Sequence, residues 1–339
     1  MKKLLITGLL FVFAISLLNA QTVLTKKWEL VADQDAQASF IVSTSSDNTR
    51  GMAFNPATNH ILVVSRLTTP PIIWVLNASN GSVVTTLNTD TTIMTGGTYP
   101  MSKIGASGDG AIYVANLAIA NANFRIYKYA NEGATPTLLV SDTSAIRFGD
   151  SFRVVGSGAN TRLYVSGSSS TTVRIYDGNG NLVAVATNPL NQFARQAIAP
   201  EAGGDGANFW GTGVGNPLTQ CDSTGATIGT ITTDIVPIGS GCAVYAEFDS
   251  KKYVMTNNWA ANSTDCKGLV VDVTSGAANA SIAYQTSSLK GANYSPAVAN
   301  GTFEVAYDPT TRTVFYLTER NSISAWEILP VEDWALYQK

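Results

Sequence analysis

The chain has 339 residues, of which 45% are hydrophobic and 13% are charged, with a formal net charge of −3. The hydrophobic content argues against intrinsic disorder, and the scarcity of basic residues argues against a nucleic-acid partner, because phosphate binding needs a strongly basic surface. A chain of this length is large for one ordinary domain but suits a single repeat domain.

Residues 1–20 have the pattern of a secretory signal peptide. Two lysines precede an apolar run over residues 4–18, and Ala20 ends the segment. The apolar run is shorter than the roughly 20 residues of a membrane span, so we expect cleavage after Ala20 in preference to an uncleaved anchor. The mature domain is then 21–339, secreted, periplasmic or held at the cell surface, and no later segment predicts a membrane span.

Short runs rich in Val, Ile, Tyr and Thr follow, separated by Gly, Asn, Asp and Pro. Such runs favour strands, and the residues between them favour turns. The clearest are HILVVSR at 60–66, AIYVANL at 111–117, RLYVSG at 162–167, KYVMTN at 252–257 and TVFYLTE at 313–319. No segment after Ala20 has a sustained helical period, so the sequence predicts an all-β fold.

Four of these runs are followed by a second pair of β-type segments joined by a tight turn. The pairs span 72–87, 124–140, 173–185 and 268–284, and a weaker sixth unit covers 207–213 and 218–230. After the run at 313–319, only one further β segment follows, at 322–328. Four strands that recur roughly every 50 residues predict a single β-propeller of about six four-stranded blades, with seven as the alternative. A β-sandwich or a β-solenoid fits this repeat less well.

Each of the six units begins near a residue that can be identified from the spacing of the repeat. These residues are Arg50, Lys103, Arg153, Arg195, Cys242 and Glu304. The last unit lacks an outer strand after 322–328, and the segment LTKKWELV at 24–31 can supply it, with 334–338 as the rival. We therefore expect pairing of the N- and C-terminal segments to close the ring, because an open ring leaves unpaired strand edges.

Several segments resemble known families. IYVANL at 112–117 and the Asp/Asn-x-x-x-Gly turns resemble the repeats of YVTN-type propellers. The segments at 48–66, 103–117 and 148–158 resemble an uncharacterised family of secreted bacterial proteins, closely over the first half of the chain and loosely over the rest. The resemblance implies a propeller and export, and it brings no activity from which a catalytic residue could be transferred.

The start of each inner strand and the end of each second strand lie on one face of a propeller, where ligands commonly bind. Basic residues are frequent at this level, and Trp259 adds an aromatic side chain. The candidate ligand-binding residues are Arg50, Arg66, Lys103, Arg153, Arg195, Trp259 and Arg320. Guanidinium groups bind carboxylates and phosphates, so the ring suits an anionic or carbohydrate ligand. The alternative is that Asp47, Asp150 and Glu304 neutralise these cations internally.

A calcium site on the same face is a second hypothesis, because oxygen ligands suffice for Ca²⁺. Asn116, Asp150, Asn258 and Glu304 could supply it, by analogy with propeller lactonases of the gluconolactonase type, which hold a metal with Glu, Asn and Asp in such a place. No other cofactor is predicted.

The remaining chemistry-bearing residues are one histidine and three cysteines. His60 lies in a turn on the opposite face, where we expect a solvent-facing side chain, so no Ser-His-Asp triad and no catalytic residue is assigned. Cys242 and Cys266 fall in the same unit and are the candidate disulfide, although a strand lies between them; Cys221 is expected to be unpaired.

The sequence therefore predicts an exported propeller that binds a small ligand, a glycan or a surface protein and has no assigned catalysis. The alternatives are a metal-dependent hydrolase or lactonase with its site at the channel mouth, and a structural component of the cell surface. Fold alone does not choose among them.

Overall fold

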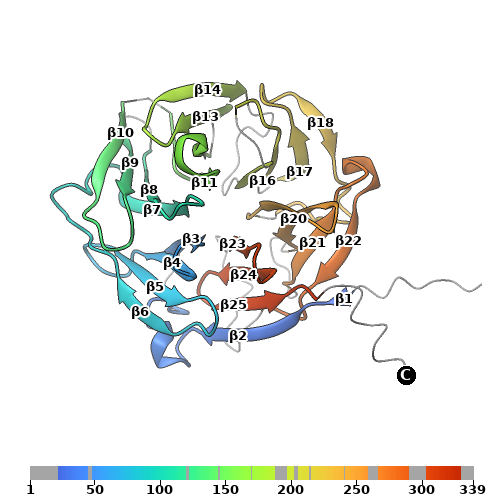
Figure 1. The fold of residues 1–339 in the computed structure, drawn as a ribbon, viewed down its shortest axis with the longest axis horizontal. Coiled ribbons are helices and arrows are strands. Elements are labelled where there is room, and N and C mark those ends of the chain that lie inside the picture. Colours follow the sequence, from blue (N-terminus) through green and yellow to red (C-terminus); the bar gives the residue numbers. More distant parts are fainter. Residues whose placement is uncertain are drawn as a thin grey trace, which may run out of the picture.

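Six antiparallel sheets stand around a central axis in the computed structural model of the protein (Figure 1). The structure describes residues 22–44, 48–119, 122–143, 146–168, 170–187, 197–201, 205–213, 215–239, 241–258, 266–289 and 303–329. The predicted all-β propeller with six four-stranded blades is confirmed. The proposed signal peptide at 1–20 lies outside the described residues.

The first three blades follow one another along the chain, each running from the axis outward. Blade 1 contains β3 (Thr49–Asn55), β4 (His60–Ser65), β5 (Ile72–Asn77) and β6 (Val83–Thr86). Blade 2 contains β7 (Tyr99–Ala106), β8 (Ile112–Leu117), β9 (Phe124–Tyr129) and β10 (Thr137–Asp142). Blade 3 contains β11 (Ser151–Val155), β12 (Arg162–Ser166), β13 (Thr172–Asp177) and β14 (Leu182–Thr187).

The last three blades repeat the order. Blade 4 contains β15 (Ala197–Pro200), β16 (Phe209–Gly213), β17 (Asn216–Cys221) and β18 (Thr227–Thr230). Blade 5 contains β19 (Val244–Phe248), β20 (Lys251–Asn257), β21 (Gly268–Asp272) and β22 (Ser281–Gln285). Blade 6 contains β23 (Phe303–Asp308), β24 (Thr313–Thr318) and β25 (Ser322–Glu327), and its fourth strand comes from the other end of the chain.

That fourth strand is β2 (Thr25–Val31), which pairs antiparallel with β25 along its length. The predicted closure by the segment at 24–31 is therefore confirmed; the rival segment at 334–338 lies outside the described residues. The short strand β1 (Thr22–Val23) continues onto the next blade, where it pairs parallel with β22. In Figure 1 the blue strands β1 and β2 run along the outer edges of blades 5 and 6.

Helical structure in the described part of the chain is limited to three single-turn 3₁₀ segments. These are η1 (Ala36–Ala38), η2 (Gly158–Asn160) and η3 (Ala277–Asn279). None of the described helices is long and apolar enough to cross a membrane.

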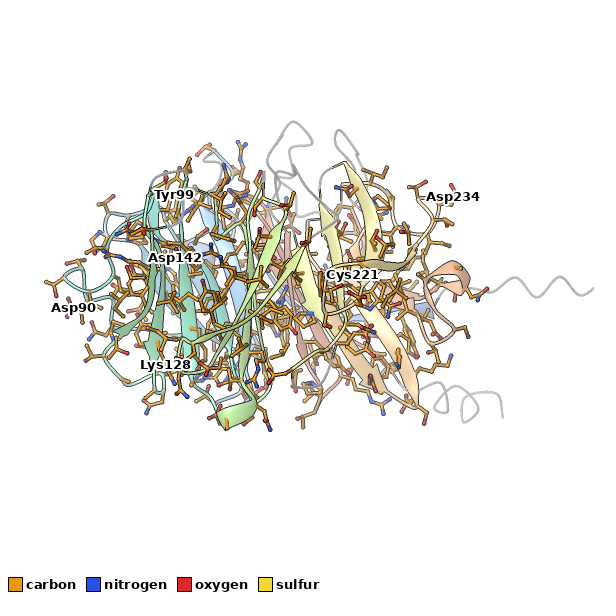
Figure 2. All side chains as sticks on the ribbon, turned by 90° about the horizontal axis from the view of Figure 1, so that it is seen from above. Asp90, Tyr99, Lys128, Asp142, Cys221 and Asp234 are labelled. Atoms are coloured by element: carbon orange, nitrogen blue, oxygen red, sulfur yellow. The ribbon has the colours of Figure 1, made fainter. Side chains whose placement is uncertain are left out.

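The disc has two unlike faces. On the loop face, long connections enter each inner strand and second strands end; Tyr99, at the start of β7, lies on this side in Figure 2. On the turn face, inner strands end in turns and the outer hairpins close; Lys128, near the end of β9, lies on this side. Residues at equal depth in successive inner strands therefore share one level of the axis.

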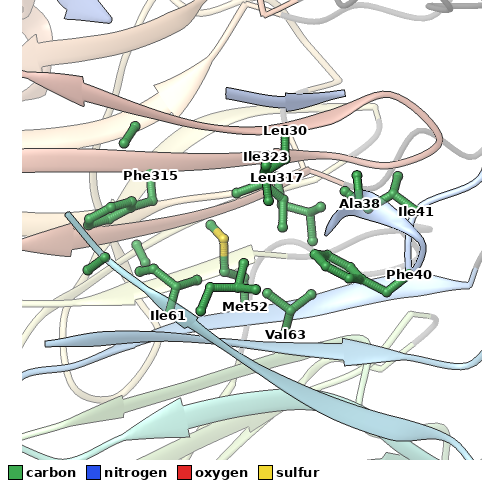
Figure 3. Packing of buried hydrophobic residues seen from close by; sticks show 14 of the residues in the cluster. Leu30, Ala38, Phe40, Ile41, Met52, Ile61, Val63, Phe315, Leu317 and Ile323 are labelled. Carbon is green, nitrogen blue, oxygen red and sulfur yellow. The ribbon is translucent and has the colours of Figure 1, made fainter. Parts of the chain in front are cut away.

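The hydrophobic core is divided into six clusters, one at each joint between neighbouring blades. Second strands such as β8 and β24 are buried along their whole length, because blades cover both of their faces. They consequently read as continuous apolar or aromatic runs rather than as alternating ones. At the joint between blades 6 and 1, shown in Figure 3, Phe40 and Ile41 of the N-terminal segment pack among Met52, Phe315 and other residues.

Two glycines with similar positive φ values give a first prediction. Gly149 has a φ of +96° and Gly276 a φ of +86°. A Cβ at 149 would lie 1.9 Å from the backbone oxygen of Asn116, whereas a Cβ at 276 would have no atom within 4 Å. We expect Gly276→Ala to cost about 1–3 kcal/mol, because its φ of +86° and ψ of 167° lie in a region that essentially only glycine adopts. We expect Gly149→Ala to cost about 4 kcal/mol or more, because backbone must also move. Urea unfolding of both variants measures the difference, and equal losses would contradict the packing argument.

Candidate functional site

Three cations and one carboxylate meet at the axis. Arg50 comes from β3, Lys103 from β7, Arg153 from β11 and Glu304 from β23, so four different blades contribute. The Lys103 ammonium donates a hydrogen bond to Oε1 of Glu304, and Nη2 of Arg153 lies 3.6 Å from Oε2 of the same carboxylate. The side chains of Lys103 and Glu304 are only 5% and 9% exposed. We call Arg50, Lys103, Arg153 and Glu304 the axial charge cluster.

The Arg153 side chain spans the axis. Its Nη1 donates to the carbonyl oxygen of Val305 at 3.1 Å, and its Nη2 donates to that of Ala243 at 2.7 Å. Val305 belongs to blade 6 and Ala243 directly precedes the inner strand of blade 5. A single guanidinium therefore connects blade 3 with blades 5 and 6. The five N–H donors of an arginine side chain allow it to bind several acceptors at once.

The cluster carries more positive than negative charge. Burial lowers the pKa of Lys103, the neighbouring Glu304 carboxylate acts in the opposite direction, and the charges of Arg50 and Arg153 lower the pKa further. Lys103 and Arg153 thus share the carboxylate of Glu304. An added anion at this level would reduce the repulsion among the cations.

A cavity of about 180 Å³ adjoins the cluster on its turn-face side. Its walls include the ends of β3 and β23 with the turns that follow them, through Phe54, Pro56, Tyr307 and Pro309. Val244, the first residue of β19, also contributes to the lining. Arg153 is the charged residue of its lining. The Arg153 Nε is buried and has no hydrogen-bond partner among the described residues. The site therefore joins an apolar chamber to a guanidinium donor.

The other cations of the predicted ring are spread more widely. Arg66 follows the second strand of blade 1 and stacks on Tyr99, with 3.8 Å between its guanidinium carbon and the ring centre. Arg320 donates from Nε to the backbone oxygen of Ser43 at 2.7 Å. Arg195 and Trp259 lie outside the described residues. The structure thus brings Arg50, Lys103 and Arg153 together and places Arg66 and Arg320 one strand farther from the axis.

The family model of the domain of unknown function DUF4623 matches residues 15–324 of this chain. The protein belongs to the DUF4623 family. The comparison with curated proteins found no match.

Solved structures support the architecture of this DUF4623 protein. A crystal structure of a DUF4623 family protein from Bacteroides eggerthii DSM 20697 is 18% identical, with a TM-score of 0.64, over 91% of this chain and 77% of the other. A chain of the mitotic checkpoint complex is 14% identical, with a TM-score of 0.52, over 90% and 95% of the two chains. The WD40 β-propeller domain of Doa1 is 11% identical, with a TM-score of 0.52, over 83% and 79%. At such identities these likenesses establish the fold only.

The four residues suggested for calcium have separate roles in this DUF4623 protein. Asn116 donates to the backbone oxygen of Asn123 and accepts from the N–H of Arg125, and Asn258 accepts from the N–H of Lys267. Both amides thereby close the loop between a second and a third strand.

The two carboxylates are also engaged. Asp150 accepts two hydrogen bonds from Arg147 and one from the N–H of Ser168, and Glu304 accepts from Lys103. Within the described ranges, no group of three or more His, Cys, Asp or Glu side chains is placed to hold a metal ion.

The cysteines are buried thiols, so the predicted disulfide between Cys242 and Cys266 is not formed. The strand β20 separates β19 from β21 in the sheet, and these two cysteines precede β19 and β21 respectively. The Cys242 sulfur instead accepts a hydrogen bond from the Asn257 amide at 3.2 Å. Burial raises the pKa of the Cys221 thiol to about 12, which suppresses the reactive thiolate.

The prediction of a solvent-facing His60 is wrong. Its ring is 19% exposed and its Nδ1 lies 2.8 Å from Oε2 of Glu132. The Asn55 amide and the Thr58 hydroxyl donate to the other oxygen of that carboxylate. Glu132 sits in the outer hairpin of blade 2, so these contacts fasten blades 1 and 2 on the turn face.

Sequence reasoning missed the aromatic walls of the axial cavity. Phe54 and Tyr307 occupy matching positions near the ends of the inner strands of blades 1 and 6. The motifs FNP at 54–56 and YDP at 307–309 carry this match in the sequence. Aligning the ends of the inner strands, and not only their beginnings, would have found it.

A second cavity, of about 350 Å³, lies on the loop face between the connection after β4 and the segment that joins β6 to β7. Its lining consists of threonine, proline, methionine and glycine, with Pro70, Pro71, Met94 and Met101 among them. This lining has no charged group to orient an anion, so the axial cavity is the stronger candidate.

Proposed function

We propose that this protein is an exported, non-catalytic binding module that holds a small anionic ligand on the axis of the propeller. The axial charge cluster supports this proposal, because Lys103 and Arg153 both lie at the single carboxylate of Glu304, which leaves room for a further negative charge. Burial is the main cause of the lowered pKa of Lys103, and the nearby charges of Arg50 and Arg153 lower it further. The pattern of residues 1–20 supports export.

The contacts of the cluster favour binding over bond-making. Lys103 and Glu304 are buried and hydrogen-bond each other, so neither is placed as a base or a nucleophile toward a ligand. Arg153 is fixed by two backbone carbonyls, which preorganises its guanidinium. A preorganised cation loses little freedom on binding an anion.

The test is a thermal-unfolding screen of the mature chain against sodium benzoate, citrate, glucuronate and sulfate at constant ionic strength. We expect at least one of these anions to raise the melting temperature by a few degrees, since a ligand at about 100 times its Kd stabilises by about 2.7 kcal/mol. Arg153→Gln should abolish the shift, because the substitution removes the charge at the axis.

The matched control is Arg320→Gln, which also removes one cation. The Nε of Arg320 donates to the backbone oxygen of Ser43, away from the axial cavity. This variant should keep the full shift. Circular dichroism of both variants checks that they are folded. If no anion stabilises the protein, or if the shift survives Arg153→Gln, the proposal is overturned.

A further inference from the structure

We infer that the axial cavity binds an aromatic carboxylate, with the carboxylate on Arg153 and the ring directed toward the turn face. This inference rests on the proposed function and names the ligand class and the side of entrance. The observations that carry it are the volume of the cavity, its aromatic walls and the presence of Arg153 as the charged residue of its lining.

The volume suits one ring. A cavity of about 150 Å³ lined by aliphatic and aromatic side chains is known to hold benzene. The axial cavity measures about 180 Å³, which accommodates a benzene ring and one attached carboxylate. A large glycan or a protein segment does not fit this space.

The walls suit an aromatic ring. Phe54 and Tyr307 contribute to the lining from neighbouring blades, and Ala53, Val154, Val244 and Ala306 supply small aliphatic surfaces. Phe54 and Tyr307 are both half-buried, so parts of their rings are available to a ligand. Offset or edge-to-face contact with such rings stabilises an aromatic pair by about 0.5–1.5 kcal/mol beyond the area buried.

The inner end suits a carboxylate. Arg153 Nε is buried without a partner among the described residues, although the two Nη atoms are held by carbonyl groups. Arg153 lines the cavity with a side chain that is 13% exposed, so its guanidinium can pair with an incoming carboxylate in a charge-assisted interaction. The charges of Lys103 and Arg153, which share the carboxylate of Glu304, offset the desolvation of the incoming charge.

The direction of entrance follows from the lining. Pro56 and Pro309 begin the turns after β3 and β23, so the cavity extends toward the turn face. The Lys103–Glu304 pair lies on the loop-face side of the chamber, since both residues precede the lining positions of their strands. A ligand that enters from the turn face therefore meets apolar walls first and the guanidinium last.

The experiment compares benzoate, benzamide and cyclohexanecarboxylate by isothermal titration on the mature chain. Benzamide keeps the ring and loses the charge, and cyclohexanecarboxylate keeps the charge and loses the aromatic face. We expect benzoate to bind more tightly than benzamide by about tenfold or more, the equivalent of one charge-assisted hydrogen bond. Cyclohexanecarboxylate should bind more weakly than benzoate, because it cannot make the ring–ring contacts.

Three variants locate the site. Arg153→Gln should weaken benzoate by about tenfold and leave benzamide unchanged. Ala306→Leu should remove binding of both, because the larger side chain fills the chamber. Ala184→Leu is the matched control, since Ala184 is exposed on β14, and it should bind like the parent protein.

The outcomes separate the two proposals. If citrate, glucuronate or sulfate binds in an Arg153-dependent manner and benzoate does not, the proposed function stands and this inference fails. If benzoate binds but Ala306→Leu does not affect it, the axial cavity is the wrong site and the inference also fails. If no acid binds, both fail.

Discussion

A mature chain that begins at Ala32 in place of Gln21 is expected to lose its cooperative fold. The truncation removes β1 and β2 and thereby leaves β25 and β22 with open edges. It also removes Leu24 and Leu30, which are buried at two different joints between blades. Each buried leucine alone is worth about 2–5 kcal/mol, and a domain of ordinary stability has only about 5–15 kcal/mol in total.

Circular dichroism and urea unfolding of the truncated chain measure this effect. A synthetic peptide of residues 21–33 added in trans should restore part of the transition, because it can pair with β25 as the native strand does. The control is Lys27→Ala in the full mature chain, which alters an exposed residue of β2 and should change stability by less than about 0.5 kcal/mol. A truncated chain that unfolds as cooperatively as the parent would contradict the role of β2.

Replacement of Glu304 by leucine is expected to cost about 3–5 kcal/mol, the range for removing one partner of a buried ion pair. The substitution leaves the buried Lys103 ammonium without its carboxylate and keeps the repulsion from Arg50 and Arg153. The double variant Lys103→Met with Glu304→Leu should recover most of the loss, because it removes the uncompensated charge together with its partner. Urea unfolding of the two single variants and the double variant completes a double-mutant cycle.

The exposed pair between Lys251 and Asp272 is the matched control for that cycle. The Lys251 side chain is 53% exposed, so solvent screens the interaction. We expect a coupling energy of about 0.2–1 kcal/mol there. A similar value for Lys103 and Glu304 would show that the axial charge cluster does not hold the inner strands together.

The β-propeller architecture could be predicted from the sequence, because strands and turns are encoded by short local segments. The β-type runs at 60–66 and 111–117 and the tight turns after third strands mark each blade within a few dozen residues. The segment at 24–31 was identified as the closing strand because the last unit lacked one. The repeat also led us to expect Arg50, Lys103 and Arg153 at a common level, since repeated units place equivalent residues around one axis.

The contacts of these residues could not be predicted from the sequence, because their partners lie on other blades across the ring. Arg153 reaches carbonyls of blades 5 and 6, and the separation between these residues in the chain is 90 and 152 positions. The same holds for His60, whose partner Glu132 lies 72 residues away in another blade. The axial cavity arises from small residues such as Ala53 and Ala306 on different blades, and no single segment carries that pattern.

The amino-terminal strand β1 leaves the molecule at the circumference, beside β22, and not at the hub. A linker attached before Thr22 would consequently join the propeller at its outer edge. Both flat sides would then remain accessible to diffusing solutes, which makes an amino-terminal linker the suitable choice for immobilising the protein in binding measurements.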